Sequence, residues 1–258
     1  MTNADHPRFT AVLARTVRMP WPAQGAQGTN GFASVPTLVA GARYVEWTVR
    51  CHGQPDHTGY LVSITPIDAG VRAWARTWDG PIESIDCMHS LAASCAGAAL
   101  PPLAGLSLRV SPQHIYHWEP SMPERLHVQV SFEFSASHRL ALPDCSDAEN
   151  HALFGKCSNP NGHGHNYRLD VTVATNPAVP NAVGTLEAVV DREIMPRLDH
   201  KHLNLDCPEF AGLNPSVEHI ALVCRNLLQA PLRAAGLDLV CVTVWETAKT
   251  CATVQAAG

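Results

Sequence analysis

The sequence has no long hydrophobic run, no secretion-type leader and few charged residues. Charged residues make up 16% of the 258 positions. The longest apolar stretches fall well short of the roughly 20 residues that a membrane span needs. The opening MTNADHPRFT lacks the basic and apolar segments of a secretion signal. We therefore expect a cytoplasmic protein with no membrane partner.

Basic clusters and paired cysteine motifs are also missing. The net charge is −5 at pH 7 and no segment is rich in Lys and Arg, so a nucleic-acid partner is not expected. The nine cysteines include no C-x-x-C motif, which is typical of reduced thiols. No H-E-x-x-H motif is present, which argues against that type of zinc hydrolase. The 14 histidines, in contrast, indicate metal or acid–base chemistry.

Proline residues predict a junction between two halves of the chain. The segment HWEPSMPER contains Pro120 and Pro123, and it separates a first domain, residues 1–120, from a second, residues 121–258. Residues 20–42, rich in Gly, Pro, Ala and Gln, are predicted to form a loop. A 46% hydrophobic content is enough for each half to bury a core.

The second half has the pattern of a β-β-α-α-β-β unit. Alternating apolar residues predict strands over 126–140 and 163–175, and helical spacing predicts helices over 184–198 and 214–232. Pro196 is expected to end or bend the first helix, whereas Asn214 and Pro215 suit the cap and first position of the second. Residues 236–254 supply one or two further strands.

The first half can be aligned with the second at an offset of about 125 residues. This alignment places Trp118–Glu119 opposite Trp245–Glu246. An internal duplication explains it, and the first half has no His-Gly-His sequence where the second strand begins. We therefore predict a degenerate first unit without a metal site.

Three histidines of the second half are predicted to meet at one rim of the sheet. His163 and His165 are two residues apart in a strand, so their side chains share a face. His138 ends the preceding predicted strand and adjoins them if the two strands pair antiparallel. Three neutral imidazoles suit Zn2+ and leave a fourth position open for water or substrate, as in catalytic sites.

Three further positions are candidates for the chemistry. Cys157 precedes His163 by six residues; it is a fourth zinc ligand, a thiol that moves a proton beside the metal, or a packed loop cysteine. Asp199 precedes His200, and such a carboxylate can orient an imidazole for proton transfer. Glu246 lies on the apolar face of a strand, where a carboxylate needs a partner such as the N–H groups of a heterocycle.

Five segments together resemble the 6-pyruvoyl-tetrahydropterin synthase family, which includes the 6-carboxytetrahydropterin synthases of queuosine biosynthesis. They are FSASHRL, ENHALFGKCSNPNGHGHNYRLDVTV, LDHKHLNLD, NPSVEHIA and VWETAKT, between about residues 126 and 254. The resemblance implies an α+β tunnelling fold, in which ββααββ units place helices on one face of an antiparallel sheet. Such units close into barrels, so we expect a homo-oligomer such as a trimer or hexamer-like barrel.

The resemblance also implies roles for individual residues. Zinc would be bound by His138, His163 and His165. The catalytic residues would be Cys157, Asp199 and His200, the last two acting across a subunit contact. Glu246 would anchor the pterin, and Ser216 and Glu218 would line its pocket.

Family members act on 7,8-dihydroneopterin triphosphate, and two products are open. The five residues between Cys157 and His163 favour the 6-pyruvoyl product. The Ala-rich, tandem layout favours a bacterial 6-carboxytetrahydropterin synthase, which also releases acetaldehyde. A non-catalytic pterin-binding or scaffold protein is a further alternative, against which the retained thiol, Asp–His pair and histidines argue.

Overall fold

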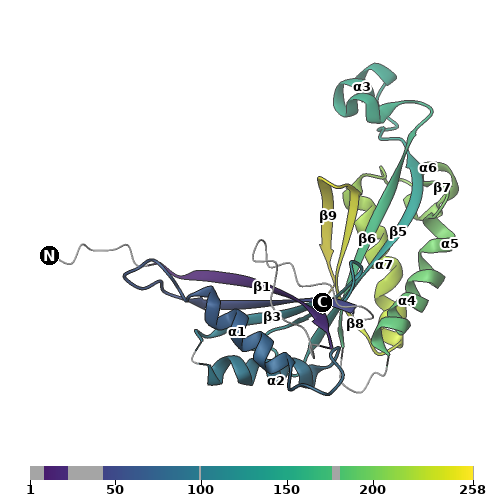
Figure 1. Cartoon of the computed structure of the whole chain (residues 1–258). Helices are drawn as coiled ribbons and strands as arrows, with labels where there is room; N and C mark the ends of the chain where they lie inside the picture. Colours follow the sequence, from purple (N-terminus) through teal and green to yellow (C-terminus); the bar gives the residue numbers. More distant parts are fainter. Residues whose placement is uncertain (1–8, 23–42, 99, 176–180, 258) are drawn as a thin grey trace. The chain divides into compact units, whose positions relative to one another are not determined.

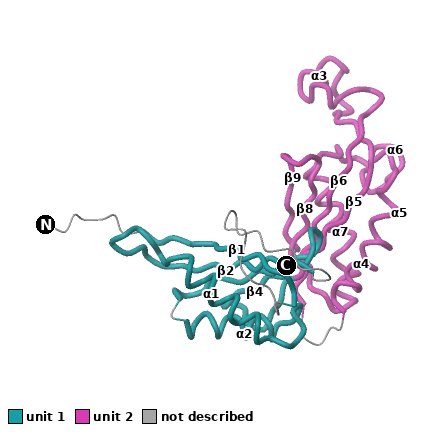
Figure 2. The backbone as a smooth tube through the Cα atoms, viewed as in Figure 1, with its two compact units in different colours: residues 1–127 teal, residues 128–258 magenta. Residues whose placement is uncertain are grey.

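The computed structural model describes residues 9–22, 43–98, 100–175 and 181–257 (Figure 1). From residue 23 on, the predicted loop over 20–42 lies outside the described residues. The chain divides into two compact units, residues 1–127 and 128–258 (Figure 2). In the described part of the chain, no helix combines the length and the apolar character that crossing a membrane requires.

Unit 1 is an antiparallel four-stranded sheet with two helices. Its elements are β1 (Ala11–Trp21), β2 (Arg43–Gly53), α1 (Ile64–Ala75), α2 (Ile85–Gly97), β3 (Leu103–Arg109) and β4 (His114–Trp118). The strands follow one another in the order β1-β2-β3-β4. Its core contains an aromatic cluster, in which Trp74 packs edge-on against the buried Trp47 and stacks on Trp78.

Unit 2 carries the same order of main elements with additional short ones. Its elements are β5 (Leu126–His138), α3 (Asp147–Phe154), β6 (His163–Thr175), α4 (Ala182–Glu193), α5 (Met195–Leu198), β7 (Lys201–His202), α6 (Leu203–Asp206), α7 (Val217–Ala234), β8 (Asp238–Thr247) and β9 (Thr250–Gln255). The sheet order is β5-β6-β8-β9, and β7 pairs parallel with β5. Figure 1 shows α4 and α7 along the sheet, whereas α3 projects beyond its end.

The predicted strands and helices of this unit are confirmed. In β5 and β6 the apolar positions are buried on alternate residues, as period-two patterning requires. Pro196 does interrupt the first helix: α4 ends at Glu193, and the proline lies in the first turn of α5. The sheet is therefore antiparallel in β6, β8 and β9, with mixed pairing only where β7 joins β5.

The predicted start of α7 is wrong by two residues. The cap is Ser216, whose hydroxyl accepts a hydrogen bond from His219 N at 3.4 Å. Asn214 instead accepts from Ala141 N at 3.2 Å and ties down the loop after β5. Pro215 lies before the helix because its carbonyl is engaged elsewhere, 2.7 Å from His138 Nδ1.

The alignment of Trp118 with Trp245 is also wrong. Trp118 ends β4, the last strand of unit 1, whereas Trp245 lies in β8, which is followed by one more strand in unit 2. By their order along the chain, β1 corresponds to β5, β2 to β6, β3 to β8 and β4 to β9. The internal duplication itself stays a prediction.

Candidate metal centre and its surroundings

The ends of two paired strands bring three imidazoles together. Side-chain hydrogen bonds join Ser131 to Asp170 and Ser135 to Asn166, so residue numbers rise along β5 as they fall along β6. That antiparallel register places the last residue of β5 opposite the first of β6. The potential ligand atoms of the three residues all lie within 4.8 Å of one another, and the residues are His138, His163 and His165.

His138 is held in one tautomer. Its ring is fully buried, and its Nδ1 lies 2.7 Å from the carbonyl oxygen of Pro215. Because a carbonyl can only accept, Nδ1 must donate, and the lone pair is left on Nε2. Burial lowers the pKa of His138 to about 4. The imidazole is therefore neutral at neutral pH, which is the form that binds a metal.

The nitrogen positions fit a zinc ion. His138 Nε2 and His163 Nε2 are 3.1 Å apart; two nitrogens bound tetrahedrally at about 2.05 Å from zinc would be about 3.3 Å apart. Within the described residues, His165 Nε2 and His163 Nδ1 are buried without a hydrogen-bond partner. An unpaired buried nitrogen costs about 1–3 kcal/mol, and coordination would remove that cost at Nε2. Burial also lowers the pKa of His163.

A carboxylate lies directly beside the imidazoles. Glu246 Oε1, near the end of β8, is 3.5 Å from His138 Nε2 and 3.7 Å from His165 Nε2. Its side chain is 21% exposed, so one side still faces solvent. Glu246 also contributes, after burial, to the raised pKa of the Tyr167 hydroxyl. The carboxylate thus lies beside the imidazoles and is partly exposed to solvent.

Cys157 lies in a short turn that is anchored to the end of β5. The turn is a 3₁₀ helix, Gly155–Ser158, and the carbonyl of Cys157 accepts from Leu140 N at 2.9 Å. The half-buried thiol is close enough to contribute to the raised pKa of Tyr167. Among the described residues, however, the metal-binding group contains three histidines and no cysteine. The fourth-ligand reading of Cys157 therefore has no support in the geometry.

Asp199 and His200 contact each other through their side chains. Asp199 Oδ1 accepts from Ser135 N at 2.8 Å, and Oδ2 lies 2.9 Å from His200 Nδ1. These bonds, above all the one from the Ser135 amide, lower the pKa of Asp199. His200 has a left-handed backbone, φ 58°, and its ring is 82% exposed. The carboxylate is therefore ionised and the imidazole is presented to solvent.

The Asp199–His200 pair is not part of the group of three histidines. His200 lines an open depression with Ser135, Ala136, Ser137, Gly164, His165 and Asn166. In their strands Ser135, Ser137, Gly164 and Asn166 alternate with the histidines, so their side chains belong to the opposite face of the sheet. The structure thus brings the three zinc-ligand candidates together and leaves Asp199 and His200 outside their group.

A profile of known proteins matches this half of the chain. The family model for 6-pyruvoyl tetrahydropterin synthase covers residues 127–257, half of the 258 residues. The chain belongs to the 6-pyruvoyl tetrahydropterin synthase family. The family therefore accounts for unit 2, whereas residues 1–126 precede the matched region.

Several known members of the family are similar to unit 2. The 6-pyruvoyl tetrahydrobiopterin synthase of Homo sapiens is 43% identical over 129 residues, which cover 48% of this chain and 88% of that protein. The enzyme of the same name from Pongo abelii is 46% identical over 114 residues, covering 42% and 79%. A solved 6-pyruvoyl tetrahydropterin synthase from Caenorhabditis elegans superposes with a TM-score of 0.46 at 29% identity, covering 52% of this chain and 96% of that one.

Sequence reasoning missed two contributors to the site. The first is the Pro215 carbonyl, which fixes the tautomer of His138. The second is Tyr167, which is fully buried, stacks on Phe134 and lies 6.1 Å from the His138 ring. Strand alternation does place Tyr167 on the histidine face, so the pattern contained a signal for it. No pattern in the sequence points to a backbone carbonyl.

Ser216 and Glu218 lie at the start of α7. Ser216 caps the helix, and its hydroxyl lowers the pKa of Glu218. Because Pro215 contacts His138, this end of the helix is next to the histidines. A role of either side chain in binding a substrate stays a prediction.

Proposed function

We propose that the chain eliminates triphosphate from 7,8-dihydroneopterin triphosphate and forms 6-pyruvoyl-tetrahydropterin in a zinc-dependent reaction. The observation that carries this proposal is the group of three imidazoles within 4.8 Å, with the Glu246 carboxylate 3.5 Å from one of them. Relatives named 6-pyruvoyl tetrahydrobiopterin synthase match the unit that contains this group. They favour the pyruvoyl over the carboxy product.

The histidines and Glu246 would have different roles, in binding zinc and in binding the pterin ring. Zinc held by His138, His163 and His165 would supply a positive charge that acidifies a neighbouring hydroxyl of the substrate. Glu246 would accept hydrogen bonds from N–H groups of the pterin ring. A ring fixed there directs its hydroxylated side chain toward the histidines, since the carboxylate lies beside them.

Two residues would move protons. Cys157 would take a proton from the substrate side chain. His200, oriented by Asp199 at 2.9 Å, would handle the second proton transfer as triphosphate leaves. The reaction needs no external oxidant, because the side-chain carbons that bear hydroxyls become carbonyls while the ring C=N bond and the carbon that loses triphosphate are reduced.

A second copy of the chain would complete the site. The His200 ring is 82% exposed and is not part of the group of three imidazoles, which supports a site that another copy completes. We therefore propose a homo-oligomer in which Cys157 and the zinc ligands come from one copy and Asp199 with His200 from another.

Product analysis tests the proposed reaction. Zinc-loaded protein is incubated with 7,8-dihydroneopterin triphosphate, and the products are identified by mass. Inorganic triphosphate together with 6-pyruvoyl-tetrahydropterin supports the proposal. Release of acetaldehyde would instead show the 6-carboxytetrahydropterin reaction, and binding without turnover would show a pterin-binding protein. A Cys157→Ala variant that releases triphosphate at the wild-type rate would remove the thiol from the mechanism.

A further inference from the structure

The chain contains few lysines, and they are unevenly distributed along the sequence. Of 18 Lys and Arg residues only three are lysines. Each lies within three positions of a residue of the proposed site: Lys156 precedes Cys157, Lys201 follows His200, and Lys249 comes three residues after Glu246. Unit 1 contains none.

The lysines also differ from the arginines in their partners. Several arginines form ion pairs with carboxylates, such as Arg15 with Asp68 and Arg197 with Glu209. Across the described residues, no lysine ammonium group forms a salt bridge or a side-chain hydrogen bond. An ammonium group without a carboxylate partner keeps its full charge available for an anion.

Two of the lysines are held in place by the same elements as the catalytic candidates. Lys156 lies in the 3₁₀ turn of Cys157, and its carbonyl accepts from Asn159 N at 3.3 Å. Lys201 begins β7, which pairs with β5 at Ala136. It lines the same depression as His200, together with hydrogen-bonding side chains and no acidic residue. The nearest carboxylate in sequence, Asp199, is already bonded to Ser135 N and to His200.

We propose that Lys156 and Lys201 bind the triphosphate group of the substrate, a role that rests on the proposed function. A triphosphate ester carries about four negative charges at neutral pH, whereas the chain has a net charge of −5. Local cations are therefore needed, and an ammonium group binds phosphate oxygens as a compact charge with three donors. Lys201 comes from the copy that supplies His200, so the two lysines approach the leaving group from two chains.

Binding of inorganic tripolyphosphate tests this assignment without turnover. Calorimetry with its magnesium salt compares the full-length wild type with Lys156→Gln, Lys201→Gln and the double variant. The zinc content of the recovered protein is measured to separate chelation from binding. Each single variant is expected to raise the Kd about 5- to 20-fold and the double variant at least 50-fold, while Lys→Arg variants retain most of the affinity.

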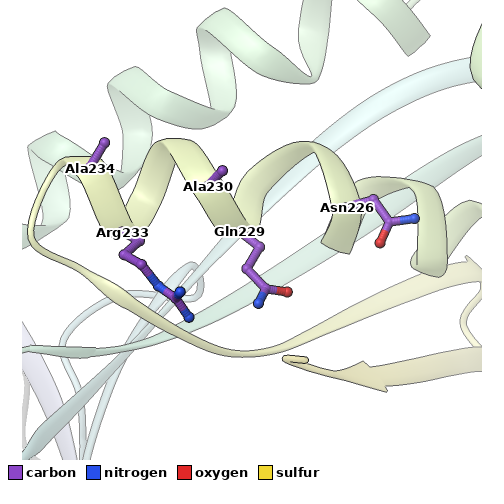
Figure 3. Close-up of a pocket in the computed structure, with 5 residues that line it drawn as sticks. All are labelled: Asn226, Gln229, Ala230, Arg233 and Ala234. Atoms are coloured by element: carbon purple, nitrogen blue, oxygen red, sulfur yellow. The ribbon is translucent and has the colours of Figure 1, made fainter. Parts of the chain in front are cut away.

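Arg233→Gln is the matched control. Arg233 lies with Asn226 and Gln229 on a groove of α7 (Figure 3). It follows Pro215 by 18 residues, which is about 27 Å along a helix, and its removal should leave the Kd unchanged. Wild-type Kd values in both lysine variants, or an equal loss in Arg233→Gln, would overturn the assignment.

Kinetics separate this proposal from the reaction itself. If the substrate is converted and the lysine variants raise KM, the proposed reaction and the lysine assignment are both supported. If the substrate is converted but KM and the tripolyphosphate Kd are those of the wild type, the lysine assignment alone is wrong. If no substrate is converted but tripolyphosphate binding depends on both lysines, the proposed reaction is wrong and the anion site stands.

Discussion

At the scale of single residues, the site combines a buried imidazole, His138, with an exposed one, His200. His138 is fully buried, donates to Pro215 through Nδ1 and has its pKa lowered to about 4. His200 is 82% exposed and is steered by an ionised carboxylate. The first environment suits a metal ligand and the second suits proton transfer with a substrate.

An Asp199→Asn variant tests the orienting role of the carboxylate. The amide oxygen can still accept from Ser135 N, so the backbone contact at 2.8 Å is kept while the charge next to His200 is lost. We expect kcat to fall about 100-fold with KM changed less than threefold, because the imidazole loses its orientation rather than its contact with the substrate. The rate of triphosphate release measures this. An unchanged kcat would remove Asp199 from the mechanism.

At this scale the sequence allowed the positions of site side chains to be predicted, but not the backbone groups that bind them. Two-residue spacing in a strand was enough to predict that His163 and His165 share a face, and the position of His138 at a strand end predicted the third imidazole. The Pro215 carbonyl could not be predicted, because its distance of 77 residues from His138 is closed only by tertiary packing. The position of His200 next to β5 depends likewise on long-range pairing, that of β7 with β5.

At the scale of elements, the start of α7 couples helix stability to the site. Ser216 caps the helix, and the preceding carbonyl holds His138. The sequence pattern predicted Asn214 as the cap and Pro215 as the first helical position, although Ser216 also has a side chain that can cap a helix. Propensity could not choose among them, since the choice was made by the long-range bonds of Asn214 and Pro215.

Two serine variants separate the structural and functional effects of a helix cap. Ser84 caps α2 of unit 1 and accepts from Cys87 N at 3.1 Å, as Ser216 does for α7. Ser84→Ala and Ser216→Ala should each lower the free energy of unfolding by about 1 kcal/mol. Only Ser216→Ala should also weaken zinc binding, by about 3- to 10-fold, because the Pro215 carbonyl shifts. Urea unfolding and zinc titration measure the two effects, and equal zinc affinities would contradict the coupling.

At the scale of the whole molecule, the two units share an order of main elements, and within the described residues the candidate metal-binding group lies in unit 2. β1 and β2 meet as β5 and β6 do, with the last residue of one opposite the first of the next, Trp21 opposite Arg43. The positions that correspond to His138, His163 and His165 are therefore Trp21, Arg43 and Val45. None of these side chains is a usual zinc ligand, which supports the prediction that unit 1 binds no zinc.

Unit 1 should nevertheless respond to pH through His117. Burial, and then the charge of Arg50, lowers its pKa to about 4. The unfolded chain binds this proton below about pH 6.5, so stability is complete above that pH and is lost as the pH falls toward 4. The loss is on the order of 2 kcal/mol. Urea unfolding followed by tryptophan fluorescence at pH 7 and pH 5 measures it, since all tryptophans except Trp245 lie in unit 1.

A His117→Gln variant is the control for this pH response. Glutamine can keep a hydrogen bond to Ser107 Oγ, 2.8 Å from His117 Nδ1, without titrating. The variant should lose less stability than the wild type between pH 7 and pH 5. Identical losses would show that other groups cause the response.

Mixing of inactive variants tests whether the site is shared between copies. Cys157→Ala and His200→Ala should each be inactive alone. After exchange of subunits, an equal mixture should recover about a quarter of the wild-type rate, because one site in four then combines an intact Cys157 with an intact His200. A mixture of Cys157→Ala with His163→Ala, both from one side of the site, should stay inactive. Failure of the first mixture to recover would place the whole site in one chain.

X-ray absorption spectroscopy of the purified, zinc-loaded protein shows whether the three histidines bind the metal. We expect one zinc per chain with three imidazole nitrogens at about 2.0–2.1 Å and an oxygen in the fourth position, and loss of the zinc in His165→Ala. A sulfur atom at about 2.3 Å, a second zinc per chain, or zinc retained in His165→Ala would contradict it.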